Sequence, residues 1–290
     1  MARSPAHRFG QIVGEVLEVA IRPLLERFAQ QHGLYLDMKG ERPCRRGRKC
    51  SWIDLNNNSH DLDFVLERGG TPDKIGMPVA FIETAWRRYT KHSRNKAQEI
   101  QGALEPLAET YRHLAPFKGA VLAGVFTDGA IAQLRSLGFT VLYFPCESVV
   151  KAFRKFGIDA SSDESTSDRK FQRRVTAFEQ LSEQEKKRLA GELAKAHSAD
   201  VRGFLESLAT AVLRQIERII VLALHGEIHE VTTVDDAISF ISSYPIQSTS
   251  KPLHRFEVEV RYNNGNVIAG RFGDQESAIG FLRGFQPVSQ

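Results

Sequence analysis

The chain has 290 residues, of which 42% are hydrophobic and 26% are charged, and its net charge at neutral pH is +4. This composition is typical of a folded globular protein and excludes a disordered chain, a collagen-like fibre and a disulfide scaffold. Because single hydrophobic cores rarely grow beyond about 250–300 residues, we expect one large domain or two modest ones.

Hydrophobic runs along the chain are short. The longest, such as residues 219–224, fall well below the roughly 18 residues that cross a bilayer, so we expect no membrane span. The N-terminus has no apolar core of the signal-peptide type, and three cysteines, Cys44, Cys50 and Cys146, cannot form a closed set of disulfides. The sequence therefore predicts a soluble protein of the reducing cytoplasm.

The first half of the chain alternates helical and β-rich patterns. Apolar residues recur at helical spacing from 9 to 31, and Gly33 follows as a stop signal. This order predicts an α/β fold, in which helices cover a mixed β-sheet. The segments predicted after the first helix are strands at 62–67 and 78–84, a helix at 93–113, a strand at 120–126, a helix at 129–137 and a strand at 140–144.

The composition of the sequence changes near residue 159. Residues 159–169 are polar and acidic, as in a linker, and we expect them to separate a domain at 1–158 from a C-terminal module at 170–290. The module is predicted to be α+β and to serve dimerisation or target recognition. No internal repeat is evident. Its predicted elements are helices at 170–196 and 200–225, a β-hairpin at 255–272 around Asn264-Gly265, and a short helix at 274–283.

Positive charge is concentrated in two segments. Residues 39–49 hold six bases and one acid, and residues 86–96 hold five bases, no acid, and two aromatic side chains. Basic and aromatic side chains together favour contact with nucleic acid. The alternative for residues 39–49 is a disordered surface loop, and the alternative for residues 86–96 is a solvated face. The predicted DNA-binding residues are Arg45, Arg46, Arg48 and Lys49 in the first segment, and Trp86, Arg87, Arg88, Tyr89 and Arg94 in the second.

Two acidic residues stand at the ends of neighbouring predicted strands. Asp63 begins the strand at 62–67, and Glu83 ends the strand at 78–84. Because adjacent strands lie only about 5 Å apart, the two carboxylates can converge on one cation. Carboxylate oxygens without a Cys or His partner favour Mg²⁺, for which Mn²⁺ can substitute. The alternative is that both acids are solvated or paired with nearby arginines.

With these residues in place, the sequence from 9 to 157 resembles the PD-(D/E)XK nuclease superfamily, which has a restriction-endonuclease-like fold. Leu62-Asp63 matches the Pro-Asp element, and Glu83-Thr84-Ala85 matches the Glu-x-Lys element, with Leu62 in place of proline and Ala85 in place of lysine. The resemblance implies that Asp63, Glu83 and the Thr84 carbonyl hold a metal ion.

The missing lysine leaves two interpretations open. Members of this family often move the lysine to the following helix, where Lys96 is the first candidate and Lys91, just before it, the second. Alternatively the site is disabled, by nature or by deliberate substitution. The family sometimes adds a helix glutamate to its metal ligands, which Glu15 or Glu99 could supply, although Glu15 could equally sit at the rim of its helix stripe.

The leading hypothesis is a Mg²⁺-dependent DNA endonuclease of restriction or phage-defence type. Cleavage of both strands at a two-fold site requires two active sites, so we expect a homodimer acting on double-stranded DNA. A competing hypothesis is a catalytically inactive, nuclease-like protein that only binds DNA. A third is a nuclease toxin or a structure-specific resolvase.

Overall fold

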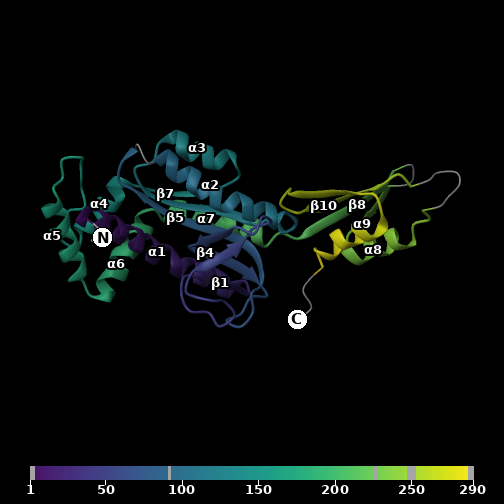
Figure 1. Ribbon diagram of the computed structural model, residues 1–290, viewed down its shortest axis with the longest axis horizontal. Helices are drawn as coiled ribbons and strands as arrows, with labels where there is room; N and C mark the ends of the chain where they lie inside the picture. Colours follow the sequence, from purple (N-terminus) through teal and green to yellow (C-terminus); the bar gives the residue numbers. More distant parts are fainter. Residues whose placement is uncertain (1–3, 91–92, 225–227, 247–252, 287–290) are drawn as a thin grey trace. The chain divides into compact units, whose positions relative to one another are not determined.

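The computed structural model describes residues 4–90, 93–224, 228–246 and 253–286 (Figure 1). The chain divides into two compact units. The first consists of Met1–Thr110 and Phe117–Leu208, and the second of Tyr111–Pro116 and Ala209–Gln290. Within the described ranges no helix is long and apolar enough to cross a membrane, and the three cysteines are free thiols.

A mixed β-sheet forms the centre of the first unit. Its first three strands are antiparallel neighbours, and its last three run parallel. Residues 79–82 and 120–123 are fully or almost fully buried, as expected for strands that are covered on both faces. In sheet order the strands are β1 (Leu34–Met38), β4 (Phe64–Arg68), β5 (Met77–Arg87), β6 (Phe117–Gly124) and β7 (Thr140–Pro145).

Helices cover both faces of this sheet, which confirms the predicted α/β class. Figure 1 shows α2 and α3 on one side and α1 on the other. The helix α1 begins after Ser4, whose hydroxyl accepts a hydrogen bond from the His7 amide and so caps the helix. The elements are α1 (Pro5–Gln31), α2 (Ser93–Thr110), α3 (Asp128–Ser136), α4 (Cys146–Arg154), α5 (Asp168–Glu179), α6 (Glu183–Ala196), α7 (Ser198–Val212), and a hairpin of β2 (Cys50–Ile53) and β3 (Ser59–Leu62).

The predicted boundary between the domains is wrong. Helices α5 and α6, which we assigned to the C-terminal module, pack against α1 in the first unit. The ring of Phe171 lies 6.1 Å from that of Phe9, and Phe178 lies at the same distance from Phe153. The polar segment at 159–169 is thus a loop within the first unit and does not link two domains. The chain passes to the second unit after Leu208.

The second unit is an antiparallel sheet with two helices among its described residues. The hairpin around Asn264-Gly265 and the last helix are confirmed, but residues 216–223 form a strand instead of the end of a helix. This strand alternates buried and partly exposed residues and pairs with the hairpin. In sequence the elements are β8 (Ile216–Ala223), β9 (Ile228–Val231), α8 (Val234–Ser243), β10 (Phe256–Tyr262), β11 (Val267–Phe272) and α9 (Gln275–Arg283), and the sheet order is β11-β10-β8-β9.

The second unit contains an internal repeat that the sequence analysis missed. A strand–strand–helix motif occurs twice, and the first strands of the two copies, β8 and β10, pair at the centre of the sheet. Each helix begins after a side-chain cap, Thr233 in α8 and Asp274 in α9. The matching residues are Ala237-Ile238 and Ala278-Ile279, of which both alanines are fully buried. The match is confined to the helices, so it is weak in the sequence.

Candidate functional site

Asp63 and Glu83 lie side by side where β4 and β5 end their pairing. Phe64 is the first residue of β4, and its pair with Ile82 is the end of the ladder between β4 and β5. One residue further, the Asp63 amide donates to the Glu83 carboxylate instead, over 3.1 Å between N and Oε1. The two acids that the sequence predicts to converge are therefore neighbours in the structure.

Thr84 fixes the orientation of the Asp63 carboxylate. Its backbone N–H and its hydroxyl both donate to Asp63 Oδ2, each over 2.7 Å. The other carboxylate oxygens, Asp63 Oδ1 and Glu83 Oε2, accept no hydrogen bond from any residue that the structure describes. Each acid thus has one oxygen held by the protein and one that is available to a ligand.

Ionisation of Glu83 is unfavourable in this site. Glu83 is only 9% exposed, and burial, followed by the charge of Asp63, raises its pKa to about 8. Lys96 opposes this shift, and Glu18 adds to it. A carboxyl group whose ionisation is this costly is typical of a functional site, because a cation bound there would remove the penalty.

The charge of Asp63 also acts on Glu18 of α1, a residue that the sequence analysis did not name. Burial, the charge of Asp63 and that of Glu15 raise its pKa to about 7, while Lys39 lowers it. Glu15, the residue predicted to join the metal ligands, is instead exposed and paired with Arg8 over 2.7 Å. Among the described residues, no third acid joins Asp63 and Glu83 in a metal-binding group.

Lys96 of α2 lies close enough to lower the pKa of Glu83, and its ammonium group also pairs with Glu99 Oε2 over 3.1 Å. The other candidate, Lys91, lies outside the described residues. Ala85, which occupies the lysine position of the motif, is buried. Of the candidate positions that the structure describes, Lys96 is the one that places a cation beside the acids.

A groove of about 460 Å³ opens between the start of α1 and the end of β5. Its lining includes Thr84 and Lys96, so it adjoins the acidic pair. Trp86 also lines it, and the indole ring lies between two glycines. A Cβ on Gly10 would be 3.9 Å from Trp86 Cδ1, and one on Gly124 would be 2.6 Å from Cζ3. Gly124 therefore makes room for the indole beside the acidic pair.

The second basic segment is partly engaged within the protein. Arg87 pairs with Glu99 over 3.3 Å, and Arg88 donates to the Ala6 carbonyl over 2.6 Å. The hydroxyl of Tyr89 donates to the Asp163 carbonyl over 2.9 Å. Both Arg88 and Tyr89 still line the groove. Arg94 is exposed on α2, so its predicted contact with DNA remains a prediction.

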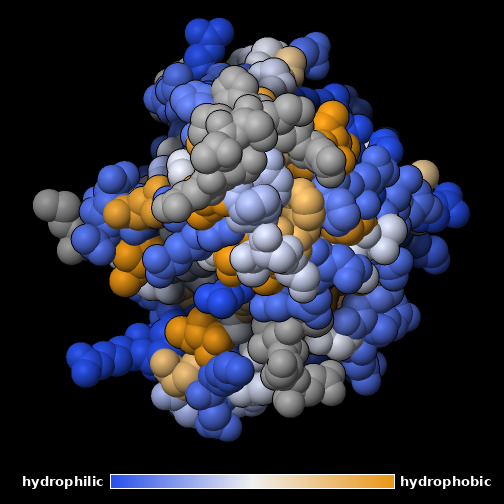
Figure 2. Space-filling model, turned by 90° about the vertical axis from the view of Figure 1, so that its right-hand side faces the viewer, coloured by the Kyte–Doolittle hydropathy of each residue, from blue (hydrophilic) through white to orange (hydrophobic). Residues whose placement is uncertain are grey.

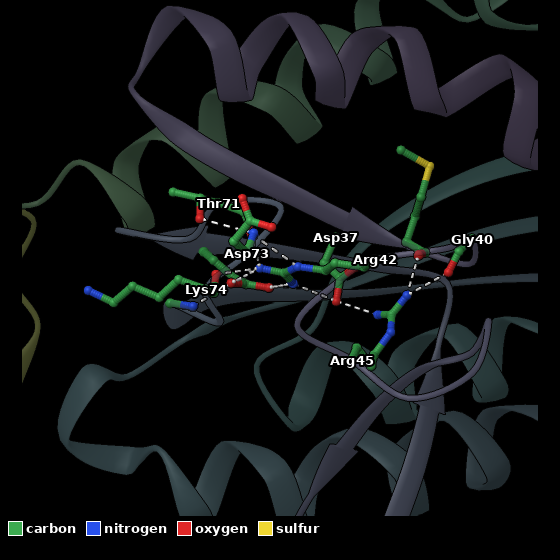
Figure 3. A network of polar contacts seen from close by, with 10 residues as sticks. Asp37, Gly40, Arg42, Arg45, Thr71, Asp73 and Lys74 are labelled. Carbon is green, nitrogen blue, oxygen red and sulfur yellow. Dashed lines mark hydrogen bonds and ion pairs between the residues drawn. The ribbon is translucent and has the colours of Figure 1, made fainter.

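The first basic segment contains a buried ionic network, which Figure 3 shows around Arg42. The Arg42 guanidinium binds both carboxylate oxygens of Glu67, over 2.5 and 3.0 Å, and lies 2.9 Å from Asp37. Arg45 also pairs with Asp37, over 2.5 Å. The Arg45 side chain is 7% exposed, so its assignment to DNA is corrected: it fastens the loop to β1.

The remaining bases of this segment face solvent. Arg46 and Arg48 are exposed, and Lys49 is 74% exposed although it pairs with Asp61 over 2.5 Å. Exposed ion pairs contribute little, about 0–1 kcal/mol, so a phosphate can replace Asp61 as the partner of Lys49. These three residues remain candidates for DNA contact.

A divalent cation fits the acidic pair in one specific manner. Among the described residues, no group of three or more His, Cys, Asp or Glu side chains could hold a metal ion by itself. Mg²⁺, however, is usually bound by one or two carboxylates together with waters and substrate phosphates. The two available oxygens of Asp63 and Glu83 suit such an open site.

Comparisons with known proteins do not assign a family. No family model and no curated protein matches the chain. Among solved structures, the chain is similar to a protein of unknown function, AF1548, with 10% sequence identity and a TM-score of 0.27. That similarity covers 63% of this chain and 99% of the other.

Proposed function

We propose that the first unit is a Mg²⁺-dependent nuclease that hydrolyses phosphodiester bonds of DNA. The observation that carries the proposal is the pairing of Asp63 with Glu83, next to a lysine and at the edge of a groove. Acids that repel one another inside a protein are costly, and a bound cation offsets that cost. The strand order and the motif resemblance support the same assignment.

The residues of the site have separate tasks in this reaction. Asp63, Glu83 and the Thr84 carbonyl would hold Mg²⁺, which supplies Lewis-acid activation of water and phosphate. The amide and hydroxyl of Thr84 keep Asp63 in one orientation. Lys96 would place its ammonium group beside the phosphate and stabilise the negative charge that develops on it. The Lys96 ammonium group also pairs with Glu99 Oε2 over 3.1 Å.

The surroundings of the site favour a nucleic acid as the substrate. Trp86 offers an aromatic surface in the groove, and base stacking on such a surface contributes about 1–3 kcal/mol per base. The exposed bases Arg46, Arg48 and Arg94 offer contacts to phosphates. A restriction or phage-defence role, double-stranded DNA as the substrate and a homodimer as the active form are the finer parts of the proposal.

Hydrophobic residues on the face drawn in Figure 2 form several small patches between hydrophilic ones. An interface on this face would therefore be of the mixed, non-obligate kind. Sedimentation analysis with and without a DNA duplex measures the association directly. A particle of one chain under both conditions would contradict the homodimer.

The decisive experiment is cleavage of plasmid and linear DNA with Mg²⁺, Mn²⁺ or a chelator. The wild-type protein should cut with either metal, while Glu83→Gln and Asp63→Asn should bind DNA without cutting it. Asp61→Asn is the matched control, because Asp61 is an exposed acid paired with Lys49 on the neighbouring hairpin. Equal cleavage by Glu83→Gln and the wild type would refute the assignment.

The second candidate function is an inactive, nuclease-like DNA-binding protein. It is favoured by Ala85, which leaves the lysine position of the motif without a cation. In this case DNA should bind with a steep dependence on salt, and no metal should produce cleavage. Substrates that contain modified, branched or single-stranded DNA separate both candidates from a toxin or a resolvase.

A further inference from the structure

A second cavity of the first unit, of about 610 Å³, lies between the loop at 157–166 and α5. None of its lining residues belongs to the acidic site. The lining includes the basic side chains of Lys170, Arg173 and Arg174, and the hydroxyl groups of Ser161 and Thr166. The cavity is therefore polar and holds more basic than acidic side chains.

Arg174 is the unusual member of this lining. Its side chain is among the buried ones, at 9% exposure, and Nη2 donates to the Ser161 carbonyl. The other terminal nitrogen, Nη1, is buried and has no hydrogen-bond partner among the residues described. An unsatisfied buried donor costs about 1–3 kcal/mol, and more when it is charged, so an acceptor that enters the cavity would gain this amount.

Arg174 also lies near another cation. Its guanidinium carbon is 5.0 Å from the centroid of the Phe171 ring, and that of Arg88 is 4.2 Å from the same centroid. Within the described ranges, neither arginine forms an ion pair with a carboxylate. Burial lowers the pKa of Arg174, the charge of Asp159 opposes this shift, and the charge of Arg88 adds to it. An anion bound beside Arg174 in the cavity would offset the repulsion from Arg88.

The two acids in the lining are already engaged by their own loop. Asp159 Oδ1 accepts from the amide and hydroxyl of Ser161, and Asp163 Oδ1 accepts from Ser165 and Thr166. These bonds fold the loop into tight turns around the cavity. The aspartates thus shape the wall of the cavity, while the donor without a partner belongs to Arg174.

We propose that this cavity is a phosphate-binding site, in which Arg174 Nη1 donates to a phosphate oxygen and Lys170 and Arg173 hold the same group at the mouth. Guanidinium groups match phosphate in geometry and charge. The same inference points to a phosphate of a nucleic-acid chain. Tyr89 lines the groove beside the acidic pair, and its hydroxyl donates to the Asp163 carbonyl on the cavity wall.

The test measures binding of inorganic phosphate, a 5′-mononucleotide, and single- and double-stranded oligonucleotides to the full chain, by calorimetry at constant ionic strength without metal. Two variants probe the site. Arg174→Lys keeps the positive charge but removes the planar set of guanidinium N–H donors. The double variant Lys170→Ala with Arg173→Ala changes only exposed residues. Arg202→Ala, an exposed base on α7, is the matched control.

Phosphate should bind saturably to the wild type, and each variant should weaken binding about tenfold, which corresponds to ~1.4 kcal/mol. The control should bind as the wild type does. A parallel loss with oligonucleotides identifies a nucleic-acid phosphate as the ligand, and a loss with phosphate and mononucleotide alone identifies a small phosphorylated molecule. Absence of saturable phosphate binding, or unchanged binding by the double variant, would overturn the proposal.

Discussion

The backbone amide of Asp63 binds the carboxylate of Glu83, while the carboxylate of Asp63 is bound by the residue that follows Glu83. This reciprocal arrangement fastens the start of β4 to the interior of β5 at the point where their ladder stops. It also means that both acids are held by backbone groups, whose positions are set by the sheet. The acids therefore have little freedom to move apart, even though their charges repel.

The role of Thr84 can be tested by removing its hydroxyl alone. Thr84→Val keeps the amide bond to Asp63 but loses the hydroxyl bond, and we expect cleavage efficiency to fall about 10–100-fold, as it does when a ligand loses its supporting partner. Thr84→Ser retains the hydroxyl and should restore most of the activity. The measurement is kcat/KM on a DNA duplex, and unchanged activity in Thr84→Val would contradict this role.

The raised pKa values of Glu18 and Glu83 predict how stability depends on pH. Below pH 4.5 both groups are protonated whether the chain is folded or unfolded. As the pH rises to about 8, the unfolded chain gives up these protons more readily, so the free energy of unfolding decreases without metal. Glu18→Gln should remove part of this decrease and unfold at a higher temperature than wild type at pH 8.

Thermal unfolding at several pH values checks this prediction. Glu15→Gln is the matched control, because Glu15 is exposed on the same helix and paired with Arg8. Mg²⁺ should stabilise the wild-type protein at pH 8 and have a smaller effect on Glu18→Gln. If the stability of Glu18→Gln decreased with pH as much as that of the wild type, ionisation of Glu18 would not contribute to the decrease.

Substitution of Lys96 should separate catalysis from metal binding. Lys96→Met is expected to lower the cleavage rate at least about 100-fold, because it removes a charge that stabilises the reacting phosphate. It should also raise the pKa of Glu83, so that metal binding requires a higher pH. Lys96→Arg keeps the charge, and Gln98→Met, at an exposed position of the same helix, is the control. Full activity in Lys96→Met would direct attention to Lys91.

The buried network around Arg42 should matter for stability alone. Arg42→Met leaves Glu67 as an uncompensated buried charge, and loss of one partner of such a pair costs about 3–5 kcal/mol. The same change at the exposed Arg46 should alter stability by less than about 0.5 kcal/mol. Urea denaturation measures both. Equal stability of the two variants would contradict the network.

Arg46 and Arg48 should govern the salt dependence of DNA binding. Their joint replacement by Ala should reduce the slope of log affinity against log salt by about 0.9 for each phosphate contact that is lost. Arg45→Ala should leave this slope unchanged, because Arg45 is bound to Asp37 inside the loop. If Arg45→Ala changed the slope and the double variant did not, the division between structural and binding bases would be wrong.

Local pattern was sufficient for most elements of the first unit. The strands at 64–68 and 77–87 and the helix at 93–110 follow from short apolar runs and helical spacing, which depend on nearby residues only. The meeting of Asp63 and Glu83 was predictable for the same reason, since adjacent antiparallel strands bring their ends together. The strand at 216–223 was not, because its apolar part at 219–223 fits a helix and a strand equally well.

Charge was the least reliable guide. By composition, the segment at 39–49 is a basic loop, and nothing in it distinguishes Arg45, which is buried, from Arg46, which is exposed. The difference arises from Asp37, a residue on another element whose carboxylate can satisfy a buried guanidinium. Glu18 was missed for a similar reason, because only packing shows which glutamate of the helix is partly buried and affected by the charge of Asp63.

The sequence by itself determined the α/β order of the first unit, the hairpin of the second and the acidic pair, because each follows from periodicity or from neighbouring strands. The tertiary structure alone decided which bases are buried, which glutamate of α1 is affected by the charge of Asp63, and where one unit ends. These features depend on contacts between residues far apart in the chain, and the energies of such contacts leave no local pattern in the sequence.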